Sequence, residues 1–142
     1  MKKNGFTLAE LLGVMVILSL ISIITVPAVT ESLNNYKTKL CVSQINEIIS
    51  AAKSWGNENV LVLPSGEGET YDVTLRTLAE YGYIDEKVNN PVTNENFDLD
   101  TTIVTITKKG KKYKYTMDST TVDTCYSNGV KKTDEISDAT QK

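Results

Sequence analysis

The chain has 142 residues, with 15 basic and 18 acidic side chains, and a net charge of −3 at neutral pH. This length accommodates one domain beside a long apolar segment, and the acidic balance argues against a protein that binds polyanions over its whole surface. Histidine is absent, which removes the commonest general base, the Ser–His and Cys–His nucleophile pairs and most zinc sites. We therefore expect a protein that is not an enzyme and that holds no metal or cofactor.

The first feature along the chain is a short basic start followed by an apolar run that carries one acid. Two lysines precede Gly5 and Phe6, residues 11–30 hold no charged side chain, and Glu10 lies just before this run. A charge inside a membrane-spanning helix costs about 2.5–3.5 kcal/mol at mid-membrane and less near the interface. We expect a positive charge on another molecule to compensate for Glu10.

These residues resemble the processing motif of type IV pilins and pseudopilins. In that motif a basic leader ends in glycine and precedes an aromatic residue, a glutamate four positions later and an apolar helix. Here the leader is residues 1–5, and Phe6, Glu10 and residues 6–29 follow. The resemblance implies that a prepilin peptidase cuts between Gly5 and Phe6 and that the new Phe6 amine is methylated. It also implies that Glu10 of one filament subunit meets the Phe6 ammonium of the next.

The apolar segment is long enough to cross a membrane once. As a helix, residues 6–29 would extend about 36 Å, which exceeds the roughly 30 Å of a bilayer's hydrocarbon core. Lys2 and Lys3 place the N-terminus in the cytoplasm by the positive-inside rule. We expect a single-pass protein of the cell membrane that later enters an extracellular or cell-envelope filament. By the resemblance, its partners are the prepilin peptidase, further copies of itself, other pilins, membrane lipid and an inner-membrane assembly platform.

A conventional secretory signal is the alternative interpretation of the same segment. Residues 26–28 have the small residues that signal peptidase requires. A cut there would release a secreted or membrane-anchored binding module, not a filament subunit. The length of the apolar run and the position of Glu10 favour the pilin interpretation. A methylated Phe6 or a start after Ala28 would distinguish the two.

The helical pattern continues beyond the apolar segment. Pro27 removes a backbone hydrogen bond and crowds the carbonyl of Ile23, so a kink is predicted there. Further on, apolar residues recur at steps of three and four: Leu33, Tyr36, Leu40, Ile45, Ile48, Ile49, Ala52 and Trp55. This stripe predicts an amphipathic helix with one face covered by a sheet. One helix from Phe6 to Trp55 is therefore expected, with Gly56 as its C-terminal stop.

The remainder of the chain is short and mostly strand-like. Residues 57–73 are predicted to form a loop, and Thr74 to Gly82 a short helix. Three strands of an antiparallel sheet are predicted at residues 101–107, 112–117 and 121–126, with a hairpin turn at Lys109–Gly110. The fold class is then α+β, with a long bent N-terminal helix packed on a small antiparallel sheet of about three strands. The globular domain is expected over residues 30–126 and a polar tail over residues 127–142.

Two cysteines, Cys41 and Cys125, both follow the apolar segment. On the outer side of the membrane they lie in a compartment that tolerates disulfides. A bridge would tie the long helix to the C-terminal region and contribute about 4–5 kcal/mol by loop entropy. Two independent free thiols are the alternative.

Five lysines lie within residues 108–114, beside Tyr113 and Tyr115. Such a cluster is able to contact nucleic acid through phosphates and stacked bases. A solvated hairpin tip that discourages edge-to-edge aggregation is the other interpretation. The strand alternation turns both tyrosines toward the core, which favours the interpretation as a solvated hairpin tip.

Four acids offer oxygen ligands for calcium but lack the spacing of a calcium loop. They are Asp98, Asp100, Asp118 and Asp123.

Overall fold

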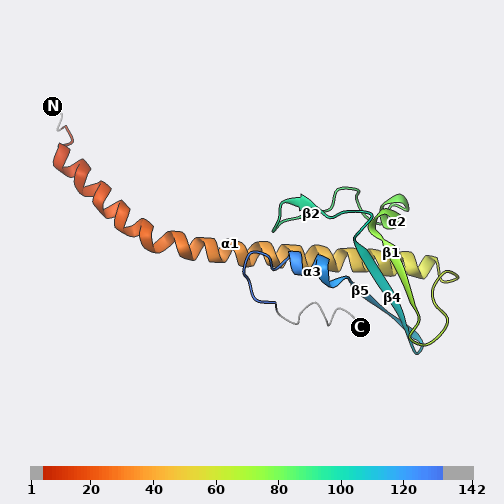
Figure 1. Cartoon of the computed structure of the whole chain (residues 1–142). Coiled ribbons are helices and arrows are strands. Elements are labelled where there is room, and N and C mark those ends of the chain that lie inside the picture. Colours follow the sequence, from red (N-terminus) through yellow and green to blue (C-terminus); the bar gives the residue numbers. More distant parts are fainter. Residues whose placement is uncertain (1–4, 133–142) are drawn as a thin grey trace.

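The computed structural model describes residues 5–132, except for the side chains of residues 24 and 25. One long helix, α1 (Leu8–Glu58), runs the length of the molecule, and a small sheet packs on its C-terminal half (Figure 1). The N-terminal half projects away from the sheet (Figure 1). The predicted α+β class is confirmed. After α1 the elements are β1 (Thr70–Thr74), α2 (Leu75–Glu80), β2 (Asn89–Asn90), β3 (Glu95–Asn96), β4 (Ile103–Lys109), β5 (Lys112–Met117) and α3 (Ser119–Thr124).

The long helix bends just before Pro27. Its parts Leu8–Ile23 and Val26–Glu58 meet at 41°. The bend lies where the proline ring crowds the carbonyl of Ile23, four residues earlier. Among the described residues no single helix is both long and apolar enough to cross a membrane, whereas this bent pair qualifies by length and composition when its parts are taken together.

The main sheet has three antiparallel strands in the order β1-β4-β5. The central strand, β4, pairs Thr105 with Asp72 of β1 on one side and with Thr116 of β5 on the other. The β4–β5 hairpin closes at the predicted turn, where Lys109 pairs with Lys112 and Gly110 has a φ of 59°. A glycine suits this left-handed conformation because it has no Cβ.

The core lies between the C-terminal half of α1 and the inner face of this sheet. Val104 and Ile106 of β4 are fully buried in this core. Trp55 of α1 stacks on Tyr71 of β1 with ring centroids 5.9 Å apart and planes 15° from parallel. The other buried apolar residues of α1 are Cys41, Ile45, Ile48, Ile49 and Ala52.

The predicted stripe on α1 was wrong at its N-terminal end. Leu33, Tyr36 and Leu40 are 54%, 61% and 39% exposed. The reason is geometric: an α-helix turns by about 100° per residue, so Leu40 faces a different direction from its neighbour Cys41, which is buried. The single stripe of the sequence is two stripes on different faces, of which the sheet covers only the second.

Two predicted elements were also misplaced. Residues 57–73 were expected to be a loop, but residues 70–74 form β1, an edge strand of the three-stranded sheet. Residues 121–126 were expected to be that strand, but they belong to α3 and the turn after it. The Asp118 carboxylate accepts a hydrogen bond of 2.8 Å from the backbone N–H of Thr121. This N-cap starts a helical turn and overrides the β-branched composition of the segment.

The ends of α1 and α2 differ in how well the sequence predicted them. Thr74 caps α2 as expected, accepting from the N–H of Thr77, and Gly82 follows the helix with a φ of 77°. Gly56, however, does not stop α1, which continues to Glu58. A Cβ on Gly56 would lie 2.5 Å from the Tyr115 hydroxyl oxygen. Gly56 therefore lets the buried ring of Tyr115 approach the helix.

Gly56→Ala is expected to lower the free energy of unfolding by about 1–3 kcal/mol through overpacking, even though alanine favours a helix by about 1 kcal/mol. Tyr115→Phe removes the oxygen that the new Cβ would meet, so Gly56→Ala should cost less in that background. Denaturant unfolding of the full chain in detergent, arranged as a double-mutant cycle, measures this coupling. Additive effects would show that the hydroxyl does not set the limit.

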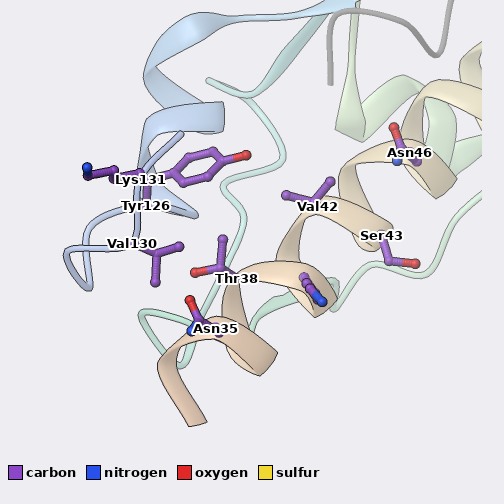
Figure 2. Close-up of a pocket in the computed structure, with 9 residues that line it drawn as sticks. Asn35, Thr38, Val42, Ser43, Asn46, Tyr126, Val130 and Lys131 are labelled. Carbon is purple, nitrogen blue, oxygen red and sulfur yellow. The ribbon is translucent and has the colours of Figure 1, made fainter. Parts of the chain in front are cut away.

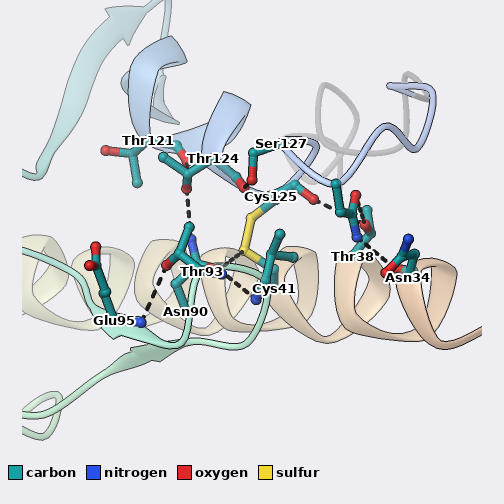
Figure 3. Close-up of a disulfide and its surroundings, with 12 residues drawn as sticks. Asn34, Thr38, Cys41, Asn90, Thr93, Glu95, Thr121, Thr124, Cys125 and Ser127 are labelled. Carbon is teal, nitrogen blue, oxygen red and sulfur yellow. Dashed lines mark hydrogen bonds between the residues drawn. A yellow bond between two sulfur atoms is a disulfide. The ribbon is translucent and has the colours of Figure 1, made fainter. Parts of the chain in front are cut away.

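A disulfide joins α1 to the segment that follows α3 (Figure 3). Cys41 and Cys125 have their Cα atoms 5.5 Å apart. Beside the bridge, the buried Thr38 hydroxyl donates a hydrogen bond of 3.0 Å to the carbonyl of Cys125. The Asn128 amide donates to the carbonyl of Asn34 at 2.9 Å, so the start of the predicted tail packs on α1. Residues 133–142 of that tail lie outside the described residues.

The double variant Cys41→Ala/Cys125→Ala is expected to unfold with about 4 kcal/mol less free energy, because the bridge closes a long loop. Thermal melting of the full chain in detergent, with and without a reductant, measures the effect. Reductant should lower the melting temperature of the parent chain toward that of the variant and leave the variant unchanged. A parent chain whose bridge is fully reduced and whose melting is unaltered would contradict the estimate.

Candidate functional site

The scissile bond expected from the sequence, between Gly5 and Phe6, lies in a non-helical segment just before α1. Helix α1 starts at Leu8, so Phe6 is not its first residue as predicted. The Phe6 side chain is 79% exposed. A Cβ on Gly5 would meet nothing within 4 Å. The fold therefore leaves this bond accessible and does not itself require glycine there. Residues 1–4, with Lys2 and Lys3, lie outside the described residues.

Thr7 and Glu10 form a capping box at the start of α1. The Glu10 carboxylate accepts hydrogen bonds from the backbone N–H of Thr7, at 2.9 Å, and from its hydroxyl, at 2.8 Å. The Thr7 hydroxyl oxygen accepts in return from the N–H of Glu10, at 3.3 Å. These contacts satisfy backbone donors that have no partner within the helix. They also hold the carboxylate at the end of the helix, within four residues of Phe6.

The sequence reasoning missed Thr7 as part of this site. The predicted helix began at Phe6, whereas in the structure Thr7 is the N-cap residue and positions the Glu10 carboxylate. The signal was present in the sequence, since a threonine followed three residues later by a glutamate before an apolar run is a capping-box pattern.

Beyond the capping box, the first half of α1 presents apolar side chains on all sides. They include Leu11, Leu12, Met15, Ile17 and Leu20, all more than half exposed. In water such a surface is unfavourable by roughly 25 cal/mol per Å² of apolar area. This half of α1 therefore requires an apolar surrounding, with the Glu10 carboxylate at its edge.

The family model of the prokaryotic N-terminal methylation motif matches residues 1–26. The chain carries the class III signal peptide of type IV pilins and pseudopilins. The match supports a pilin-like substrate of prepilin peptidase and suggests a membrane-anchored precursor with a hydrophobic N-terminal helix. No curated protein and no solved structure match the chain.

The Gly5–Phe6 bond precedes the first residue of α1, Leu8, whereas the disulfide (Figure 3) joins α1 much farther along the helix, at Cys41. Around the bridge, the side-chain oxygen of the buried Asn90 accepts from the backbone N–H of Val92 at 2.9 Å. Its amide donates to the Thr124 hydroxyl at 2.7 Å. Asn90 therefore fastens the β2 region to the segment that carries Cys125. This cluster holds the fold together and places no group near the scissile bond.

A groove of about 660 Å³ opens between α1 and the C-terminal segment (Figure 2). Tyr126 and Val130 lie across it from Thr38 and Val42 (Figure 2). The described residues that line the groove include two lysines but no acid.

The lysine-rich turn at residues 108–114 makes contacts with other groups of the same chain. The Lys108 ammonium lies 4.3 Å from the centroid of the Tyr113 ring. The Glu67 carboxylate accepts a hydrogen bond of 2.6 Å from the N–H of Gly110 and so brings a negative charge to the tip. Tyr115 is buried. These contacts favour the interpretation of a solvated hairpin tip over a nucleic-acid site.

The four candidate calcium ligands have separate structural partners. Arg76 pairs with Asp100 and lowers the pKa of that carboxyl. Asp98 accepts from the backbone N–H groups of Thr101 and Asp100, and these bonds lower its pKa. Asp118 caps α3, and Asp123 pairs with Lys132 at 2.7 Å. Each acid is accounted for by a contact within the described residues.

Because the fold does not require glycine at residue 5, substitutions there should act on cleavage alone. Gly5→Ala is expected to slow the conversion of precursor to mature chain, and Gly5→Leu to block it, since the peptidase must accommodate the side chain. Neither should change the melting temperature of the full chain. Mass spectrometry of the N-terminus in the native host measures cleavage. Normal maturation of Gly5→Leu would contradict the assigned bond.

Proposed function

We propose that this chain is a non-catalytic structural subunit of a type IV pilus-like or pseudopilus filament. The observation that carries the proposal is the arrangement at the head of α1, where an accessible Gly5–Phe6 bond precedes a capped acid and an uncovered apolar helix. Membrane lipid surrounds this helix before assembly, and the helices of other subunits surround it afterwards. The sheet and the disulfide then serve to hold a compact domain on the outer half of α1.

The physical argument concerns what drives the helix out of lipid. Moving an apolar helix from lipid into a bundle exchanges one apolar surrounding for another, so the hydrophobic contribution nearly cancels. A charged group in such a surrounding is unfavourable unless it is paired. Cleavage after Gly5 creates a positive amine at Phe6, and the carboxylate of Glu10 in a neighbouring subunit is the matching group. Orientation and register then follow from this pair.

The partners and location follow from the same assignment. The precursor crosses the cell membrane once with its N-terminus in the cytoplasm. Prepilin peptidase cleaves it, an assembly platform in the inner membrane receives it, and further copies or other pilins join it in a filament outside the membrane. The motif that supports this location is the basic, glycine-ended leader followed by the apolar helix.

Two substitutions separate the charge of Glu10 from its capping role. Glu10→Gln keeps an acceptor for the N–H of Thr7 but has no charge, whereas Glu10→Ala loses both. Both variants are expected to be cleaved and membrane-bound, and to enter filaments at least about tenfold less than the parent, since loss of a paired charge costs more than 1.4 kcal/mol. Only Glu10→Ala should also weaken the start of α1, as read by circular dichroism in detergent.

Quantitative mass spectrometry of sheared filaments measures incorporation, with the same chain in the membrane fraction as the control. Normal incorporation of Glu10→Gln would show that the charge is not needed and that capping alone explains the glutamate. A mature chain that starts after Ala28 would overturn the filament assignment itself and favour the secreted binding module.

A further inference from the structure

The segment after the disulfide contains an Asn–Gly pair, Asn128–Gly129, that is tied to α1. The Asn128 amide donates a hydrogen bond of 2.9 Å to the carbonyl of Asn34. Its side-chain oxygen lies 3.2 Å from the hydroxyl of Thr38, which donates both to it and to the carbonyl of Cys125. Asn34 and Thr38 lie beside the bridge (Figure 3). Asn128 therefore fastens the C-terminal segment to α1 close to the disulfide.

An asparagine followed by glycine loses its side-chain amide more readily than other asparagines, because glycine has no Cβ to hinder ring closure. In this reaction the backbone nitrogen of Gly129 bonds to the side-chain Cγ of Asn128. The Cγ–Nδ2 bond breaks, and ammonia leaves with the proton of the attacking nitrogen. Water then opens the cyclic imide by breaking either of its ring C–N bonds to the carbonyl carbons, which leaves aspartate or isoaspartate. Water is the sole co-reactant.

The fold holds both reacting groups away from this reaction. The N–H of Gly129 donates to the carbonyl of Tyr126 at 3.2 Å, and the Asn128 side chain is engaged on α1. Both contacts must break before the nitrogen reaches Cγ, so the rate follows the free energy of local opening. Cys125 lies three residues before Asn128 and is bonded to Cys41, so the bridge limits how far this segment opens.

We propose that Asn128–Gly129 is a deamidation site that the disulfide between Cys41 and Cys125 keeps closed. In a bridged chain the segment stays on α1 and the amide persists. In a chain without the bridge the segment opens and the amide is lost. A disulfide forms again by thiol–disulfide exchange, whereas the lost amide does not return. The modification therefore marks chains that have lacked their bridge, and it is independent of the filament assignment.

The product does not restore the contact that the amide made. A carboxylate has no hydrogen to donate to the carbonyl of Asn34, so two acceptor oxygens would face each other there. The groove beside this contact has a volume of about 810 Å³, and Glu31 and Lys131 are the charged residues among the described ones that line it. A carboxylate at residue 128 makes that lining net negative. The segment is then held less firmly on α1, even after the bridge has formed again.

Incubation of the full chain in detergent and heavy-oxygen water, followed by mass spectrometry of the peptide that contains Asn128, tests the site. The heavy oxygen enters only where an amide is lost during the incubation. The bridged parent should lose this amide at least about tenfold more slowly than the reduced parent, and Cys41→Ala/Cys125→Ala should match the reduced parent. The other Asn–Gly pair of the chain, at residues 4–5 of the leader, is the internal reference and should react equally in all three. Equal rates at residue 128 with and without the bridge would overturn the proposal.

Two further variants test the guarding contact and the consequence of its loss. Thr38→Val keeps the bridge but removes a donor to Asn128, so deamidation of the bridged chain should rise by about twofold to tenfold. Asn128→Asp installs the product, and the bridged chain should melt below bridged Asn128→Ala, which lacks the amide but adds no charge. An unchanged rate in Thr38→Val would show that this contact does not guard the amide. Parent-like melting of Asn128→Asp would show that the modification leaves the segment docked, and either result would contradict the proposal.

Discussion

The sheet covers one face of the C-terminal half of α1, and this limited cover determines which side chains of the helix are buried and which are exposed. The inner faces of β1, β4 and β5 bury the side of α1 that carries Ile45, Ile48 and Ala52. A sheet of this size gives no cover to the N-terminal half of a 51-residue helix. The fold is thus incomplete by itself: it stabilises one end of α1 and leaves the other end dependent on lipid or on other chains.

The two ends of α1 are stabilised by different interactions. At the C-terminal end, stability comes from burial, from the stacking of Trp55 on Tyr71 and from a covalent bridge at Cys41. At the N-terminal end, among the described residues, a capping box between Thr7 and Glu10 stabilises the first turn of the helix. Glu10 completes this cap through its carboxylate, and under the proposed function its charge also pairs with another subunit. The same division explains why apolar side chains are buried in one half and exposed in the other.

The sequence was informative where the signal was local. The processing motif, the cap at Thr74, the turn at Gly110 and the proline bend all depend on residues within a few positions of one another. The sequence did not predict features that depend on contacts between residues far apart in the chain. Gly56 was predicted to end the helix, but glycine is needed there because the side chain of Tyr115, a residue far away in the chain, packs against it. Which of the two apolar stripes on α1 the sheet would cover could not be deduced, because the helical period is the same for both.

Composition misled the prediction of strands. Residues 121–126 contain the β-branched side chains typical of a strand, yet Asp118 caps a helical turn there and Cys125 is fixed by the bridge. Residues 70–74 have similar composition but follow a stretch rich in glycine and glutamate, and were assigned to its loop. Thr7 shows the reverse case, since its pattern was present in the sequence and its role as a cap was overlooked.

The chain contains a single tryptophan, and its position makes it an internal optical probe. The Trp55 side chain is 4% exposed and lies against Tyr71 of β1. Its fluorescence therefore reports whether the sheet remains docked on the C-terminal half of α1, and it is insensitive to the apolar N-terminal segment more than twenty residues away. One unlabelled chain thus allows the integrity of the domain to be followed by emission spectra, separately from changes at the N-terminal half of α1.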